Sequence, residues 1–293
     1  MTFDDLSGVI AAVPTPFDAA GRPDTARFVR HCEWALANGC DGLNVLGTTG
    51  EANSLSSEDR ATVMRAAASA FDRSRLMVGT GTPALSTTIE LTRLAAELGF
   101  AAALVLPPYY YKPVSEEGLF AWFARVLDAL GACPMGLYLD NFPQLTGIRF
   151  SPELAARLAA AYPGRLRGIK DSSGDLDYAR QVASVEGFDV FPSDEAALAQ
   201  ARTDGYAGCI SATVNLTVPT AARLWRNQDD AALREEVRRR RQAIASQPLV
   251  PAVKHLIGAR EGDSAWDAVL PPLLQLSAAQ KAALATSMHS EAA

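Results

Sequence analysis

Short apolar segments alternate with amphipathic segments along most of this chain, and this alternation restricts the fold more than any other feature. The apolar segments span residues 8–13, 41–46, 75–80, 100–106, 135–139, 166–170, 188–191 and 206–211. Helical patterns lie between them at residues 24–36, 57–71, 86–98, 117–130, 151–161, 176–185 and 195–202. Parallel strands that are buried on both faces have nearly continuous apolar sequences, and the connecting helices cover them. We therefore expect an α/β fold, a closed parallel (β/α)8 TIM barrel, over residues 1–219.

The remaining residues, 220–293, have helical patterns without further strands. These patterns span residues 221–225, 231–244, 253–258 and 278–288. No stretch rich in Gly, Ser or Pro separates them from the barrel, so we expect a C-terminal helical extension packed on it. The first expected strand lacks the glycine-rich fingerprint of dinucleotide-binding folds, which argues against a doubly wound sheet.

The charge of the chain limits its partners. A net charge of -6 is unfavourable for binding nucleic acid or an anionic membrane. The one strongly basic run, Arg238–Arg241, follows Glu235 and Glu236 in a helical pattern, and we interpret it as a solvated helix face. No apolar run reaches the length of a membrane span, and residues 1–6 are acidic where a signal peptide is basic. We therefore expect a cytoplasmic protein without nucleic-acid or membrane partners.

The sequence does not indicate metal ligands or disulfides. The cysteines, Cys32, Cys40, Cys133 and Cys209, have no C-x-x-C spacing, and the histidines form no metal-binding pattern. We expect no metal site and no metal cofactor.

Lys170 is the last residue of the expected strand 166–170 and is followed by turn-forming residues. Active sites of (β/α)8 barrels lie at the carboxyl ends of the strands, where this lysine falls. Burial there disfavours the charged form of an amine, and a neutral amine is a nucleophile that forms a Schiff base with a keto acid. Alternatively, Lys170 ends its strand at the surface and pairs with Asp171 or Asp175.

Two further strand ends carry unusual residues. Gly47-Thr48-Thr49-Gly50 follows strand 41–46, and its amides and hydroxyl groups are suited to binding a carboxylate, although a plain turn has the same composition. Tyr109-Tyr110-Tyr111 follows strand 100–106, and bulky rings in a loop usually pack against a substrate pocket or a neighbouring subunit.

Six phrases spread over almost the whole chain are informative together. They are Pro14-Thr15-Pro16-Phe17, Gly47-Thr48-Thr49-Gly50-Glu51, Pro108-Tyr109-Tyr110 with Lys112-Pro113, Gly168-Ile169-Lys170-Asp171, Gly208-Cys209-Ile210-Ser211 with Asn215, and Pro271-Pro272-Leu273. These phrases resemble the dihydrodipicolinate synthase and N-acetylneuraminate lyase family and follow its order. Members of that family are class I, Schiff-base lyases and aldolases on a (β/α)8 barrel, mostly tetramers, and they need no metal.

The resemblance implies roles for individual residues. Lys170 would condense with the keto carbon of pyruvate or another 2-keto acid, without a separate cofactor. Thr48 and Thr49 would hold the pyruvyl carboxylate, and Thr49 would also relay protons. Gly47 and Ile210 would complete the substrate-binding site.

Two tyrosines complete the proton relay of the family. Tyr110 resembles the one that is inserted into the neighbouring subunit's site, which implies an obligate dimer at least, and the family's usual assembly implies a homotetramer, a dimer of dimers. For the other, the family's Y-N-x-P phrase corresponds to Tyr138-Leu139-Asp140-Asn141-Phe142-Pro143. Counting from Pro134 gives Tyr138 as the acid/base, which we favour because a phenol suits the relay, whereas counting back from Pro143 gives Asp140. Tyr138 and Asp140 share one face of the strand, and Asp140 is also a candidate for accepting hydrogen bonds from substrate hydroxyls.

Two departures from the family pattern concern the substrate. Leu145 stands where the synthase branch has an arginine that grips the carboxylate of aspartate semialdehyde. Of the consecutive acidic residues that bind sugar hydroxyls in the sialic-acid branch, only Glu195 is present, with Ala196 at the other position. We therefore favour an aldolase that reversibly cleaves a 2-keto-3-deoxy sugar acid or a related hydroxy keto acid to pyruvate and an aldehyde. The alternatives are a 4-hydroxy-tetrahydrodipicolinate synthase, a keto-deoxy-acid dehydratase that uses the same imine, and a catalytically silent barrel that binds a keto acid.

Overall fold

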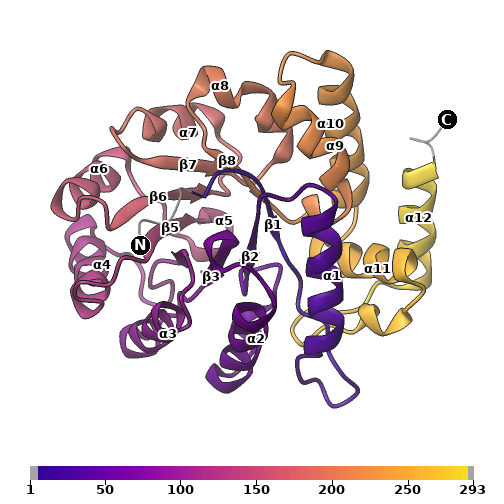
Figure 1. Ribbon diagram of the computed structural model, residues 1–293, viewed down its shortest axis with the longest axis horizontal. Helices are drawn as coiled ribbons and strands as arrows, with labels where there is room; N and C mark the ends of the chain where they lie inside the picture. Colours follow the sequence, from indigo (N-terminus) through magenta and orange to yellow (C-terminus); the bar gives the residue numbers. More distant parts are fainter. Residues whose placement is uncertain (1–5, 290–293) are drawn as a thin grey trace.

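The computed structural model describes residues 6–289, and within them eight parallel strands form a barrel surrounded by helices (Figure 1). The hydrogen-bonded order is β7-β6-β5-β4-β3-β2-β1-β8, and β8 lies against β7 to close the ring. The strands are β1 Gly8–Ala12, β2 Gly42–Val45, β3 Leu76–Gly79, β4 Ala102–Val105, β5 Gly136–Asn141, β6 Leu166–Asp171, β7 Asp189–Pro192 and β8 Gly208–Ser211. The predicted (β/α)8 TIM barrel is confirmed. Residues 1–5, on which the expected absence of a signal peptide partly depends, lie outside the described residues.

Each strand is followed by at least one helix. The helices of the barrel are α1 Thr25–Ala37, α2 Ser57–Ala70, α3 Leu85–Glu97, α4 Glu116–Ala129, α5 Pro143–Thr146, α6 Pro152–Ala161, α7 Leu176–Ala183, α8 Ala201–Asp204 and α9 Val214–Arg226. Short 3-10 segments are η1 Ala52–Ser54, η2 Arg73–Arg75, η3 Glu195–Gln200 and η4 Ser264–Asp267. Within residues 6–289, none of the helices is long and apolar enough to cross a membrane.

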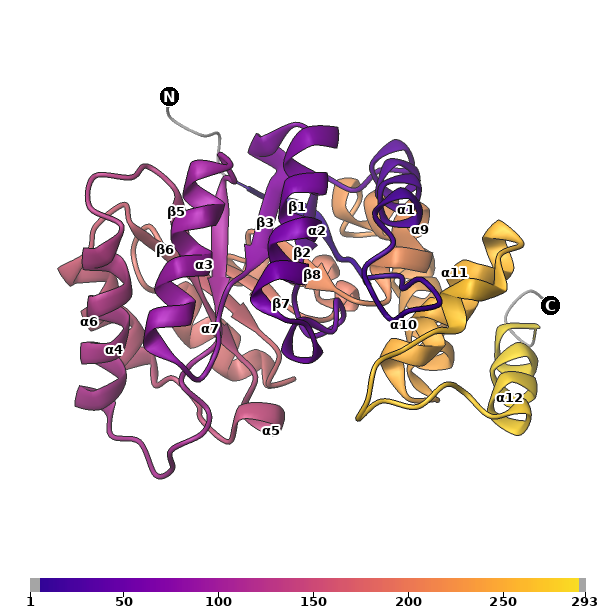
Figure 2. The same cartoon turned by 90° about the horizontal axis from the view of Figure 1, so that it is seen from below.

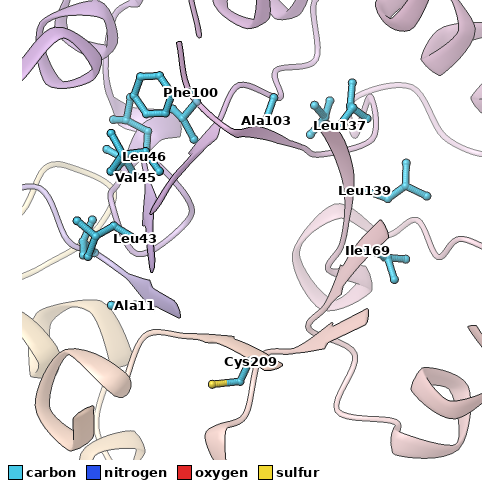
Figure 3. Packing of buried hydrophobic residues seen from close by; sticks show 14 of the residues in the cluster. Ala11, Leu43, Val45, Leu46, Phe100, Ala103, Leu137, Leu139, Ile169 and Cys209 are labelled. Atoms are coloured by element: carbon cyan, nitrogen blue, oxygen red, sulfur yellow. The ribbon is translucent and has the colours of Figure 1, made fainter. Parts of the chain in front are cut away.

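The residues of each strand face alternately into the barrel and outward to the helices. Leu43, Leu139 and Ile169 point away from the barrel axis and belong to the apolar layer under the helices (Figure 3). The interior of the barrel is filled mainly by Ile10, Ala12, Met77, Leu104, Tyr138, Phe191 and Ile210. Since Leu139 and Ile169 face outward, Asp140 and Lys170 face inward, near the carboxyl ends of β5 and β6.

Helix α9 differs from the prediction, which placed a helix only after Pro219. It begins at Val214 and contains Pro219, so the expected domain boundary at residue 219 lies inside a helix. A proline in a helix cannot donate a hydrogen bond to the carbonyl four residues earlier, here that of Asn215. That carbonyl instead accepts a hydrogen bond from Nη1 of Arg260, at 3.3 Å. The extension therefore supplies the partner that the proline removes.

The C-terminal extension lies on one side of the barrel and consists of α10 Ala231–Ala245, α11 Leu249–Glu261 and α12 Ala278–His289 (Figure 2). Its own apolar core includes Ile244, Val253 and the fully buried Trp266. Lys254 of α11 forms a buried ion pair with Glu51, which follows β2. This contact fixes the extension against the loop that follows β2.

Candidate active site

A cavity of about 420 Å³ opens at the carboxyl ends of the strands. Its walls include four of the predicted site residues, Lys170, Thr48, Thr49 and Ile210, together with Leu145. These residues come from β6, the loop after β2, β8 and α5, so the fold brings together positions that are far apart in the sequence. A larger hollow of about 550 Å³ lies between α9, α10 and α12 and contains none of these residues.

Lys170 lies next to Asp140 inside the barrel. Its Nζ is 3.7 Å from Oδ1 of Asp140, and the two residues are only 5% and 2% exposed. In the ladder between β5 and β6, the Cα of Asp140 is paired with that of Lys170. Burial raises the pKa of the Asp140 carboxyl, and the neighbouring Lys170 charge opposes this increase. The alternative in which Lys170 ends its strand at the surface is therefore wrong.

The loop Gly47-Thr48-Thr49-Gly50 is held in a tight turn at the edge of the cavity. Leu46, just before it, has a φ of 57°, which is rare for a residue with a side chain. The turn packs so closely on β3 that a Cβ on Gly79 would lie 2.1 Å from the Leu46 carbonyl oxygen. Both threonines line the cavity, and their hydroxyls make no hydrogen bond within residues 6–289. They are free to bind a ligand.

The structure does not bring Tyr138 to Lys170, contrary to the role expected for it. The Cα of Tyr138 is paired with that of Gly168, two residues before the lysine and therefore about 6.5 Å deeper along the strand. Its hydroxyl donates a hydrogen bond to Oδ2 of Asp189 at 2.7 Å. Burial and the adjacent Asp189 carboxylate raise the pKa of this phenol well above its usual value. Tyr138 fills the barrel interior, and Asp140 takes the place beside the lysine.

Glu195, expected to bind substrate hydroxyls, lies behind the cavity wall. Its side chain is fully buried and accepts hydrogen bonds from Ser211, Thr213 and Thr217. Arg241 of α10 completes the cluster, with Nη1 2.9 Å from Oε2 of Glu195. Although burial alone raises the pKa of Glu195, Arg241 and the hydroxyl donors outweigh it and hold the pKa below its usual value. All its acceptor capacity is used within the protein, so it cannot also bind substrate hydroxyls.

Arg241 also corrects the interpretation of the basic run. Arg238 and Arg239 are half-exposed, as expected of a solvated helix face. Arg241 instead turns inward, pairs with Asp194 and Glu195, and lines the cavity. Four identical residues in succession carry no signal of which one faces the protein, so the sequence could not distinguish it.

Several other lining residues were not predicted. Ser172 and Ser193 add hydroxyl groups at the ends of β6 and β7, while Phe142, Leu249 and Leu273 add apolar surface at the mouth. The serines had a usable signal, because each directly follows a strand at the end where barrel active sites lie. Leu249 and Leu273 come from the extension, and nothing in their local sequence places them near the barrel.

Tyr110 does not reach the cavity of its own chain. It is 74% exposed and Tyr111 is 78% exposed, with their rings packed edge to face in the loop before α4. Tyr109 is less exposed, and its hydroxyl donates to Oδ1 of Asn53 at 3.3 Å. Two large rings held out from the surface fit a contact with another molecule.

A buried lysine on the wall of a (β/α)8 barrel cavity, which is also lined by threonine hydroxyls without a hydrogen bond within residues 6–289, is an arrangement suited to Schiff-base chemistry. Within residues 6–289, there is no group of three or more His, Cys, Asp or Glu side chains that could hold a metal ion.

Comparisons with known proteins identify the family. A model of the dihydrodipicolinate synthetase family matches residues 5–291. The chain is 31% identical over 291 residues to an uncharacterized DapA-like lyase from Chloroflexus aurantiacus, covering 94% of each chain. It is 33% identical over 212 residues to 4-hydroxy-tetrahydrodipicolinate synthase from Coxiella burnetii, covering 72% of this chain and 71% of that one. The crystal structure of YagE, a prophage protein of this family from E. coli K12 in complex with pyruvate, has a TM-score of 0.90 at 29% identity over 99% of each chain. The chain therefore belongs to the dihydrodipicolinate synthetase family.

Members of this family are class I, Schiff-base lyases that form or break carbon–carbon bonds, and they act on small keto acids without a metal. The chain is thus a carbon–carbon lyase by family.

Proposed function

We propose that the chain is a pyruvate-dependent class I aldolase that reversibly cleaves a 2-keto-3-deoxy sugar acid, or a related hydroxy keto acid, to pyruvate and an aldehyde. The observation that carries this proposal is the buried amine of Lys170 in a cavity beside the free hydroxyls of Thr48 and Thr49. A Schiff base with a 2-keto acid requires such an amine next to donors for the substrate carboxylate.

The proposed cleavage begins when Nζ of Lys170 attacks the C2 keto carbon, whose oxygen leaves as water to give an iminium. The C4 hydroxyl then gives its proton to the relay through Thr49, the C3–C4 bond breaks, and the bonding electrons move through C3 and C2 to the nitrogen as the aldehyde leaves. Protonation of C3 and hydrolysis of the imine release pyruvate and restore the amine. Thr48 and Thr49 hold the C1 carboxylate throughout, with the Gly47 backbone beside them, and Ile210 packs against the pyruvyl part.

The outer part of the cavity supports a substrate without a second carboxylate. Leu145 is 62% exposed at the mouth, where an arginine would grip such a group, and Phe142 and Leu249 lie on the same cavity. Ser172 and Ser193 offer hydroxyl groups to the hydroxyls of an aldehyde fragment.

A second candidate is a 4-hydroxy-tetrahydrodipicolinate synthase, which is favoured by the name of the Coxiella burnetii relative. In this case Arg241, on the cavity wall, is the cation available for the carboxylate of aspartate semialdehyde. Condensation of pyruvate with aspartate semialdehyde as fast as with sugar aldehydes would favour the synthase and refute the aldolase. Loss of water from a keto-deoxy acid without aldehyde release would instead identify a dehydratase.

We also propose a homotetramer in which Tyr110 of one subunit completes the site of its neighbour. The exposure of Tyr110 and Tyr111 supports a contact between copies of the chain. Light scattering gives the mass in solution, and a monomer that is fully active would refute this assembly.

The test of the Schiff base is reduction with borohydride in the presence of pyruvate, followed by peptide mass mapping. The expected result is a reduced pyruvyl adduct on Lys170, which is absent from Lys170→Ala. A folded wild-type protein without an adduct would contradict the proposed function and favour a silent, keto-acid-binding barrel.

A further inference from the structure

The environment of Asp140 carries an inference that rests on the proposed Schiff-base function and extends it. Asp140 and Lys170 are paired across β5 and β6 and both face the barrel interior. Oδ1 of Asp140 is 3.7 Å from Nζ of Lys170, the atom that would form the imine. Asp140 is therefore the carboxyl group in contact with the reacting nitrogen.

The contact between Asp140 and Lys170 is an ion pair without a hydrogen bond. Its Oδ1 is buried and has no hydrogen-bond partner within residues 6–289, and 3.7 Å to the amine is longer than a hydrogen bond. Asp171, the carboxylate that directly follows Lys170 on β6, accepts hydrogen bonds from Asn141 Nδ2 at 2.7 Å and Ser173 Oγ at 2.8 Å. Buried polar atoms nearly always have partners, so an acceptor left free beside a reactive amine points to a partner that is present only during the reaction.

We propose that Asp140 is the catalytic acid/base of imine formation and carries the proton that a tyrosine carries elsewhere in the family. The proposed reaction starts from the neutral amine of Lys170 beside the protonated carboxyl group of Asp140. Attack on the keto carbon makes the nitrogen positive and the oxygen negative, and a proton passes from nitrogen to oxygen through the carboxyl group. The acid then gives its own proton to the hydroxyl, which leaves as water. The iminium cation remains beside the Asp140 carboxylate, so atoms and charge balance.

The surroundings of Asp140 suit this role. Burial raises the pKa of its carboxyl, Lys170 opposes the increase, and the nearby Asp171 carboxylate adds to it. These two residues are the charged groups that act on it from β6. A carboxylic acid whose pKa is raised toward neutral pH exchanges protons more effectively under physiological conditions than one with an ordinary pKa. After the reaction the iminium also stabilises the carboxylate, which favours the intermediate.

The experiment compares two variants in a quenched-flow assay in which borohydride traps the pyruvyl imine on Lys170 as a function of time. Asp140→Asn removes the titratable group but keeps the shape, whereas Tyr138→Phe removes the phenol that lies deeper in the barrel. Circular dichroism and thermal melting check that both variants are folded. We expect Asp140→Asn to slow imine formation by about 10²–10⁴-fold, while Tyr138→Phe stays within about threefold of the wild type.

Two further measurements keep the proposal open to refutation. If Asp140→Asn does not fold, Asp140→Glu should still form the imine within about tenfold of the wild-type rate, because it keeps an acid within reach of the nitrogen. The pH dependence of imine formation should lose one ionisation in Asp140→Asn, which a purely structural role would not cause. The proposal is overturned if Asp140→Asn forms the imine at the wild-type rate, if Asp140→Glu folds but forms none, or if Tyr138→Phe shows the larger loss. Absence of an adduct in the wild type would instead reject the Schiff base itself.

Discussion

The molecule contains two buried lysine–carboxylate pairs, Lys170–Asp140 inside the barrel and Lys254–Glu51 between the barrel and the extension, and their surroundings differ. Nζ of Lys254 is 2.7 Å from Oε1 of Glu51 and also donates to the Thr15 carbonyl at 2.8 Å. The other Glu51 oxygen accepts a hydrogen bond from the Leu270 amide at 2.7 Å. The distance from Nζ of Lys170 to Oδ1 of Asp140 is longer, at 3.7 Å, and this oxygen has no hydrogen-bond partner among the described residues.

The comparison shows that a buried lysine–carboxylate pair can either stabilise the fold or leave polar atoms available to a substrate. Around Lys254, every charged atom named above has a protein partner, and the Phe17 ring lies 4.1 Å from the ammonium. Such a pair joins the extension to the loops after β1 and β2, and neither residue lines the cavity. Lys170 instead borders a cavity. A buried polar group without a hydrogen-bond partner in the protein lowers the stability of the fold. Such groups are retained where a bound ligand supplies the missing hydrogen-bond partner.

The largest expected effect is on activity, in Lys170→Met. We expect pyruvate release from a 2-keto-3-deoxy sugar acid to fall at least about 10⁴-fold, because Lys170 is the one lysine among the described residues that line the cavity. Stability should change little or rise, since Asp140 can take up a proton once the lysine is removed. Initial rates and urea unfolding measure the two quantities. If Lys170→Met keeps its activity, Lys170 does not form the imine, and the proposed functional difference between Lys170 and Lys254 is refuted.

The matched substitution, Lys254→Met, should act on stability. It leaves the Glu51 carboxylate buried without its cation, so we expect a loss of about 3–5 kcal/mol in the free energy of unfolding. The double variant Lys254→Met/Glu51→Gln should recover part of this loss, because it removes the uncompensated charge. Urea unfolding of the three variants measures the effect. If the free energy of unfolding falls by less than about 1 kcal/mol, a full set of hydrogen-bond partners does not indicate that a buried pair stabilises the fold.

Glu195 and Arg241 form a third ion pair, in which the Glu195 carboxylate is fully buried. This pair tests the comparison because its carboxylate has a full set of hydrogen-bond partners, as Glu51 does, but lies beside the cavity, as Lys170 does. We expect Glu195→Gln to cost about 1.5–3 kcal/mol, since it weakens the bonds to Arg241 and three hydroxyl groups. The folded pKa of Glu195 is below its usual value, so its contribution is complete above the unfolded pKa, about 4.3, and is lost as the pH falls through the folded pKa. The difference in unfolding free energy between wild type and Glu195→Gln should therefore shrink below about pH 4. A difference that is constant with pH would contradict the assigned network.

These pairs also show which parts of the site could be predicted from the sequence. The strand ends with Lys170, Thr48, Thr49 and Ile210 could be predicted because apolar periodicity locates strands and the barrel fixes where their carboxyl ends meet. Tyr138 and Asp140 could not be separated, because residues two apart in a strand share a face and differ only in depth. That depth depends on the register between β5 and β6, which is set by contacts between strands rather than by either sequence alone.

The sequence also did not predict which residues pair with the buried charged groups. The residues that saturate Glu195 come from β8, α9 and α10, and those that bind Lys254, Thr15 and Glu51, come from the N-terminal part of the chain. Pairing over such distances leaves no periodic pattern in the sequence. The resemblance to the family suggested Glu195 as a substrate ligand, and only the packing reveals that its acceptors are already occupied.

The smallest expected effect tests whether the open side of the Lys170 cavity selects the aldehyde. Leu145 is 62% exposed at the mouth, so Leu145→Arg should change stability by no more than about 0.5 kcal/mol. A guanidinium there can bind a carboxylate through two parallel hydrogen bonds, which should shift kcat/KM toward aspartate semialdehyde, relative to a neutral sugar aldehyde, by about tenfold. Leu145→Lys is the control, since an ammonium group adds the charge without the paired donors and should shift the ratio less. Equal ratios in the wild type and both variants would mean that the distal end of the substrate does not reach Leu145, and that selectivity arises deeper in the cavity, near Ser193 and Arg241.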